Sequence, residues 1–146
     1  MLARLHVLAA RGAAGVDDDA LGRPTGEPAM LARLDTLCAV VTTPATPALL
    51  KAAVVHGELL ALRPFAGPSG LIARAAGRLT LMAGGFDPHG LIATELGHAA
   101  REPEYVGAAN AFSTGTPDGI RSWLRHCANA VEVAAQELTA LTRRPA

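Results

Sequence analysis

Residues 55–87 read VHGELLALRPFAGPSGLIARAAGRLTLMAGGFD. Apolar residues recur at helical spacing on both sides of a short segment, residues 63–70, that is rich in Gly and Pro. The stretch therefore predicts a helix, a tight loop and a second helix that begins near Ser69. Backbone N–H groups at such a junction can bind an anion. Arg63, Arg74 and Arg78 could add charge-assisted contacts, and the alternative interpretation is a plain turn.

Outside this stretch, proline marks where most of the other helices are expected to begin. Proline is tolerated in the first helical turn, where its missing N–H is not needed. Each of the segments that follow these prolines has apolar residues at helical spacing. The helix-start prolines are Pro28, Pro47, Pro88, Pro103 and Pro117. With a further helix near residues 2–10, the sequence predicts an all-α fold, a compact bundle of about seven helices in a single domain, 1–146.

The remaining segments carry weaker signals. Residues 12–26 are rich in Gly and Asp and are expected to form a loop, and a short hairpin there or at residues 40–43 stays open. Cys38 and Cys127 lie on apolar faces of expected helices, which predicts buried thiols in a reducing compartment. Arg143 and Arg144 are expected to form a solvated tail.

Composition and charge argue against two classes of partner. The chain has 13 basic and 13 acidic residues, a formal net charge of zero. A nucleic-acid-binding protein usually has a basic excess, because phosphate contacts supply most of its affinity. No apolar stretch approaches the length that spans a bilayer, and the N-terminal segment lacks the long apolar run of a signal peptide. We therefore expect a cytoplasmic protein that binds neither nucleic acid nor membrane.

Residues 63–74 resemble the signature of the Fic (Fido) family, His-Pro-Phe-x-Asp/Glu-Gly-Asn-Gly-Arg-x-x-Arg, without gaps. Pro64, Phe65, Gly70 and Arg74 match that signature. The surrounding layout is also similar: a helix with His56 precedes the loop, and Gly-Thr-Pro-Asp-Gly-Ile-x-x-Trp follows at residues 115–123. The resemblance covers nearly the whole chain and implies the family's all-α fold.

The departures from the signature bear on activity. Arg63 stands where the family has its general-base histidine, and a guanidinium does not accept a proton near neutral pH. Gly67 stands where the family's acidic residue holds the metal that bridges the nucleotide phosphates. Pro68, Ser69 and Leu71 replace the residues of the phosphate cradle. Since a general base typically contributes ~10²–10⁴-fold, the resemblance implies a pseudoenzyme with no catalytic residue, metal or cofactor.

Three functions remain open at this stage. The first is a non-catalytic domain that acts through a protein partner or as a homodimer. The second is a sensor that binds a nucleotide, phosphate or another anion with Arg63, Ser69, Gly70 and Arg74. The third is a divergent enzyme whose base is His56. The Glu95-x-x-His98 pair has the spacing of a metal-binding helix, but no second copy exists to complete a two-metal site.

Overall fold

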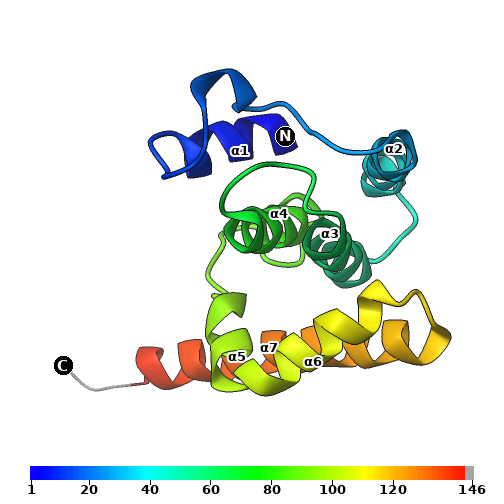
Figure 1. Ribbon diagram of the computed structural model, residues 1–146. Helices are drawn as coiled ribbons and strands as arrows, with labels where there is room; N and C mark the ends of the chain where they lie inside the picture. Colours follow the sequence, from blue (N-terminus) through cyan, green and yellow to red (C-terminus); the bar gives the residue numbers. More distant parts are fainter. Residues whose placement is uncertain (144–146) are drawn as a thin grey trace.

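The computed structural model describes residues 1–143, and within that range the chain is mostly helical and contains no strand (Figure 1). Seven α-helices and one 3₁₀ turn are present in the described chain. Their bounds are α1 Leu2–Ala10, the 3₁₀ turn η1 Asp18–Ala20, α2 Pro28–Thr42, α3 Ala48–Leu62, α4 Ser69–Ala83, α5 Thr94–Ala100, α6 Glu102–Ser113 and α7 Pro117–Thr142. The predicted all-α fold is confirmed.

The helices form three tiers. Figure 1 shows α3 and α4 in the middle, α1 and α2 on one side of them, and α5, α6 and α7 on the other. Helix α1 packs on α4 and α2 packs on α3, while α6 and α7 pack on α3 and on each other. The chain brings α3 and α4 together through the short loop 63–68, as the sequence predicts.

Two buried clusters join the tiers. Val55, Leu59 and Ala76 belong to a cluster that also holds Leu34 and Leu37 of α2. On the opposite side of α3, Trp123 is fully buried against Phe112 and Ala53, and its indole N–H donates to the Ala53 carbonyl at 2.8 Å. Gly57 makes this approach possible, because a Cβ there would lie 2.7 Å from Trp123 Nε1.

Most of the predicted helix starts are correct. Helix α2 begins at Pro28, α3 directly after Pro47, and α6 has Pro103 in its first turn. At α7, Pro117 is the first residue and the Thr116 hydroxyl accepts the N–H of Gly119 at 3.2 Å, which caps the helix.

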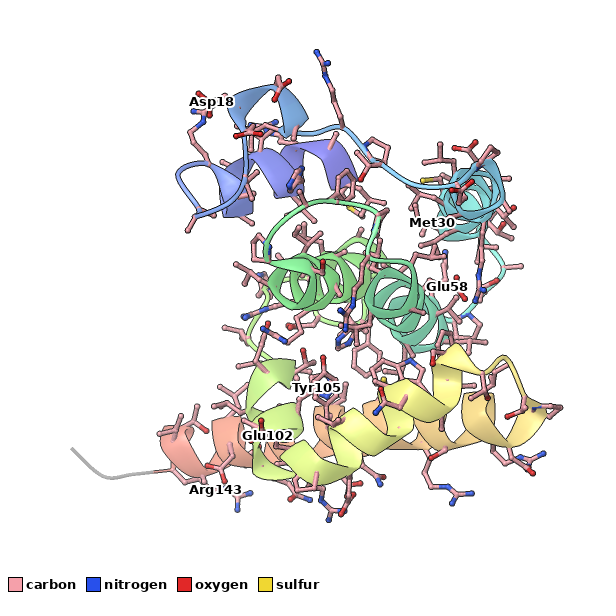
Figure 2. All side chains as sticks on the ribbon, in the orientation of Figure 1. Asp18, Met30, Glu58, Glu102, Tyr105 and Arg143 are labelled. Carbon is pink, nitrogen blue, oxygen red and sulfur yellow. The ribbon has the colours of Figure 1, made fainter. Side chains whose placement is uncertain are left out.

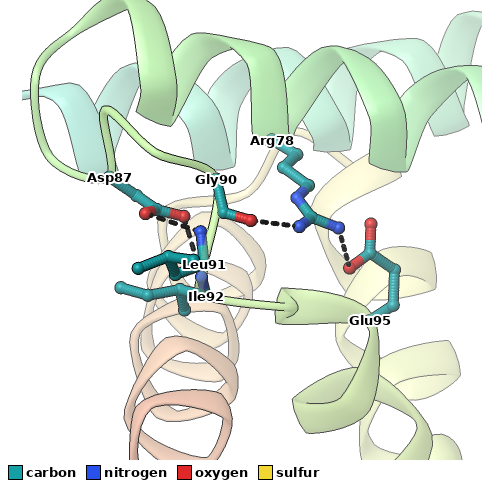
Figure 3. Close-up of polar contacts among 6 residues, drawn as sticks. All are labelled: Arg78, Asp87, Gly90, Leu91, Ile92 and Glu95. Atoms are coloured by element: carbon teal, nitrogen blue, oxygen red, sulfur yellow. Dashed lines mark hydrogen bonds and ion pairs between the residues drawn. The ribbon is translucent and has the colours of Figure 1, made fainter. Parts of the chain in front are cut away.

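The predicted helix start at Pro88 is wrong, since α5 begins only at Thr94. The buried Asp87 carboxylate accepts two N–H groups, from Leu91 and Ile92, each at 2.9 Å (Figure 3). These bonds stabilise a turn instead of a helix, because they use the side chain to satisfy backbone donors outside any helix.

Three further expectations are settled here. Residues 40–42 belong to α2, so no hairpin forms at residues 40–43, and the loop 12–26 contains only η1. Cys127 is buried as predicted, but Cys38 is exposed, because α2 buries little beyond Leu34 and Leu37. Arg143 is exposed, and Arg144 lies outside the described residues.

Within residues 1–143, no helix combines the length and apolarity that crossing a bilayer requires.

Candidate functional site

The loop between α3 and α4 is closed by its own contacts. Arg63 ends α3 in the left-handed conformation, with φ 45°, and its side chain is exposed. The Thr25 N–H donates to the Pro64 carbonyl at 2.8 Å, and His6 Nε2 lies 2.8 Å from the Ala66 carbonyl oxygen. The loop is therefore fixed to the α1–α2 side of the molecule.

Two observations argue against a phosphate cradle in this loop. Pro68 has no N–H, and the Ser69 N–H donates to the Gly67 carbonyl at 2.8 Å. Gly67 has φ 84°, and a Cβ at this position would lie 2.7 Å from Val16 Cγ2. The place of the family's acidic side chain is thus occupied by Val16 and closed by backbone conformation.

The four residues predicted to bind an anion do not converge. Arg74 lies against Gly70, since a Cβ at Gly70 would be 3.2 Å from Arg74 Nη1. Arg63 instead lines a separate groove of about 360 Å³ together with Tyr105 and Asn110. Ser69 packs against Phe65 and Ile72, where no open volume remains. Only Gly70 and Arg74 are brought together.

Arg78, the third arginine singled out from the sequence, has a structural role. Its guanidinium donates to the Gly90 carbonyl and pairs with Glu95 at 3.5 Å (Figure 3). These contacts join α4 to the turn before α5. Glu95, which the sequence singled out together with His98, is thus paired with Arg78.

The functional groups that do converge are three buried histidines. His56 of α3, His98 of α5 and His126 of α7 are each at most 6% exposed. The ring centroids of His56 and His98 are 5.0 Å apart, and those of His98 and His126 are 5.2 Å apart. We call these residues, together with Tyr105, the histidine cluster.

Hydrogen bonds pair the members of the histidine cluster. His56 Nε2 lies 3.0 Å from the Tyr105 hydroxyl, and Figure 2 marks Tyr105 in the space between α6 and the α3–α4 pair. His98 Nδ1 lies 3.0 Å from His126 Nε2. His126 Nδ1 is buried with no protein partner in the described chain. One imidazole of the His98–His126 pair must donate and the other accept, so only one of the two facing nitrogens carries a proton.

The spacing of residues on α7 and the small size of Gly97 assemble the cluster. Trp123, His126, Cys127 and Ala130 recur at helical spacing on the buried face of α7. A Cβ at Gly97 would lie 2.0 Å from the Ala130 carbonyl oxygen. Glycine therefore lets α5 approach α7 closely enough for the rings of His98 and His126 to meet.

Burial keeps the histidines neutral. Desolvation lowers the pKa of His98 to about 4, with further lowering by His126 and Arg74. Desolvation also lowers the pKa of His56 well below its usual range, and His98 and Arg74 add to this effect. The pKa of His126 is lowered mainly by desolvation, and nearby Glu104 opposes the shift. Burial raises the pKa of the Tyr105 hydroxyl, and Arg74 opposes that change.

Arg74 connects the cluster to α4. It lines a cavity of about 20 Å³ with His56, His98 and Thr94, whose other walls are largely apolar. Arg74 is not in any ion pair within residues 1–143. The histidine cluster, with three neutral imidazoles and a phenol, thus lies beside one permanent cation, the Arg74 guanidinium.

Sequence reasoning found part of this site. It singled out His56, His98 and Arg74 separately, and did not single out Tyr105. His126 was missed, although a histidine inside the apolar stripe of α7 was a usable signal. Within the described chain, no three His, Cys, Asp or Glu side chains are placed to hold a metal ion.

Comparisons with known proteins add no further assignment. No protein-family model, no curated protein and no solved structure matches this chain. Its function must therefore be argued from the residues themselves.

Proposed function

We propose that this chain is a degenerate Fic-like domain that does not transfer AMP and acts through contact with a protein partner. The observation that carries the proposal is the loop 63–70. Arg63 stands in the place of the general base, and Val16 fills the space beside Gly67 where a metal-binding carboxylate would have to stand. Restoring the acidic residue would require both a backbone change and displacement of Val16.

His56 is poorly suited to replace the missing base. Its side chain is only 4% exposed, and its Nε2 is engaged with the Tyr105 hydroxyl. A general base must come within hydrogen-bond reach of the hydroxyl that it deprotonates. In this structure the His56 side chain is buried away from any protein hydroxyl substrate.

An apolar groove favours a protein partner. This groove, of about 410 Å³, lies between α1 and α2 and is lined by Leu2, Leu34, Leu37, Cys38, Val41 and Phe65, among others. Little of the apolar surface of α2 is covered by the rest of the molecule, since only Leu34 and Leu37 of this helix are buried. An amphipathic helix with apolar side chains matches this chemistry. A second copy of the chain is one source of such a helix.

The proposed absence of AMP transfer is tested with labelled ATP. The purified chain is incubated with magnesium, adenine-labelled ATP and cell extract, and covalent label on protein is measured. We expect no label above that given by the Arg74→Gln variant, which controls for contaminating enzymes. Label that depends on this chain and disappears in His56→Ala would favour a divergent enzyme.

The proposed contact with a protein partner is tested by chemical modification of Cys38, which lines the apolar groove. A bulky maleimide should modify Cys38 selectively, because Cys127 is buried and desolvation raises the pKa of its thiol to about 12. Sedimentation over a range of concentrations then compares modified and unmodified chain. Self-association that is lost on modification would identify the partner as a second copy of the chain. If the chain is a monomer in both states, the partner has to be a different protein.

A further inference from the structure

We propose that the groove between the end of α3 and α6 binds a small organic anion, a carboxylate or phosphate group on an apolar body, with Arg63 holding the charged group. The groove has a volume of about 360 Å³. It lies on the α5–α7 side of the α3–α4 pair, whereas the groove lined by α1 and α2 lies on the other side (Figure 1). A ligand at this place therefore does not depend on the protein contact proposed above.

The size and the lining of the groove are those of a small-molecule site. One face of α6 forms most of its wall, since the lining residues of this helix recur at helical spacing: Tyr105, Val106, Ala109, Asn110 and Ser113. The facing wall is the end of α3, with Leu60, Ala61 and Arg63. Small-molecule sites in proteins typically have volumes of about 300–1,000 Å³ and a largely apolar lining, with a few polar groups that fix orientation. The groove fits this description.

The polar side of the groove selects an anion. Arg63 is the one charged side chain among the described residues that line it, and it belongs to none of the ion pairs within residues 1–143. Its guanidinium offers a planar fork of donors that matches a carboxylate or a phosphate. Asn110 is exposed, and its amide can both donate and accept a hydrogen bond. A bound anion would therefore gain a charge-assisted contact without breaking an ion pair.

The apolar side of the groove selects an organic body. Val106 is 49% exposed, and Leu60 is only half-buried, so a ligand that covers them removes apolar surface from water. Tyr105 contributes its ring, because its hydroxyl is already bonded to His56 Nε2 at 3.0 Å. A bare inorganic ion at Arg63 would leave this wall uncovered. The lining therefore favours an anion that carries an apolar or aromatic group.

The backbone of Arg63 also indicates a role for its side chain. Arg63 follows the last residue of α3 in the left-handed conformation, with φ 45°, and is the one residue other than glycine with positive φ within residues 1–143. Glycine is the usual residue at such a helix end, because it has no Cβ to oppose this conformation. An arginine held there does not favour the local backbone, so its side chain contributes something else.

The primary experiment titrates the intact chain with 2-naphthoate and with 2-naphthyl phosphate and follows side-chain signals by NMR. The chain has one tyrosine, Tyr105, and three side-chain amides, those of Asn110, Asn129 and Gln136. We expect the Tyr105 ring and the Asn110 amide to shift saturably, with a dissociation constant below about 1 mM for at least one of the two anions. Asn129 and Gln136 lie on α7 outside the groove and should not shift. Equal shifts of all three amides, or no saturable shift up to about 5 mM of either anion, would overturn the proposal.

Two matched ligands separate the charge from the apolar body. 2-Naphthol keeps the ring and lacks the anionic group, and inorganic phosphate keeps the charge and lacks the ring. Each should bind at least about tenfold more weakly than the better of the two naphthyl anions. That better anion shows whether a carboxylate or a phosphate fits Arg63. Binding of 2-naphthol or of inorganic phosphate with the same affinity would contradict the proposed ligand class.

Variants of the chain test the residues. Arg63→Gly should weaken anion binding at least about tenfold without lowering the urea midpoint of unfolding, because glycine adopts φ 45° without strain. Arg125→Gln removes a positive charge from an exposed position on α7 outside the groove and should leave the affinity unchanged. Val106→Glu places a carboxylate in the groove from an exposed position and should also abolish binding. Unchanged affinity in Arg63→Gly or Val106→Glu, or equal weakening in Arg125→Gln, would overturn the assignment.

Discussion

At the scale of single residues, the most consequential feature is a pair of neutral imidazoles joined by one hydrogen bond. His98 Nδ1 and His126 Nε2 are 3.0 Å apart, and His126 Nδ1 has no protein partner within residues 1–143. Protonating both rings would place two donors face to face and break their hydrogen bond. The folded chain therefore favours the neutral pair.

This arrangement predicts a pH-dependent stability. The pKa values of His56, His98 and His126 are lowered on folding, so the unfolded chain binds more protons below about pH 6.5. The free energy of unfolding has its full value above that pH. It falls as pH is lowered towards about 4, by up to about 1.4 kcal/mol per pH unit for each histidine. Urea unfolding at a series of pH values measures this slope. His98→Gln should reduce it and the exposed His89→Gln should not, and a flat profile between pH 7 and pH 5 would contradict the argument.

At the scale of helices, glycine decides which pairs can pack closely. Gly97 of α5 faces the Ala130 carbonyl of α7, and a Cβ there would lie 2.0 Å from that oxygen. Gly107 lies in α6 with open space around it. The two residues are both helical glycines, so they share the same intrinsic helix propensity and differ in their surroundings.

Alanine substitutions should therefore have opposite effects at these two positions. Gly97→Ala should destabilise the fold by about 3 kcal/mol or more, because the clash is with backbone that a rotamer change cannot relieve. Gly107→Ala should stabilise it by about 0.5–1 kcal/mol, since alanine loses less entropy in a helix. Chemical unfolding of both variants measures the difference. Equal effects would mean that α5 and α7 are not in close contact in solution.

At the scale of the whole molecule, the α1–α2 tier meets the middle tier through α1 on α4 and α2 on α3. Helix α1 is joined to the loops mainly by His6, whose Nδ1 accepts the Gly22 N–H at 2.9 Å while its Nε2 donates to the Ala66 carbonyl. The same ring packs on Phe65, with centroids 4.7 Å apart. Local opening of this tier can therefore occur without global unfolding.

Replacing His6 should release α1 and the loop that follows it selectively. His6→Phe keeps an aromatic ring but leaves the Gly22 N–H and the Ala66 carbonyl without their partner, at a cost of about 1–3 kcal/mol. Hydrogen exchange should accelerate at least about tenfold in residues 2–22 and remain slow in α3 and α7. Leu8→Ala is the matched control, because Leu8 lies in the same helix but is 75% exposed. Uniform acceleration along the chain would show that the tiers do not open separately.

Local signals predicted the helices well, and failed where a side chain acted over a distance. Proline positions and apolar periodicity located α2, α3, α6 and α7 because these features act within one helical turn. Pro88 was misread as a helix start, since the Asp87 carboxylate beside it accepts the N–H groups of Leu91 and Ile92 in a turn. Cys38 was misread as buried, because an apolar face is buried only if another helix covers it.

Residue identity and local spacing were enough to predict that the chain is helical, where most helices begin, and that the loop 63–70 carries neither a general base nor a carboxylate. Those properties depend on residue identity and local spacing. The packing of the helices was needed to see that Arg63 and Arg74 line different pockets and that His56, His98 and His126 meet beside Arg74. The reason is that these residues lie on helices far apart along the chain, and their proximity depends on how α3, α4, α5 and α7 pack.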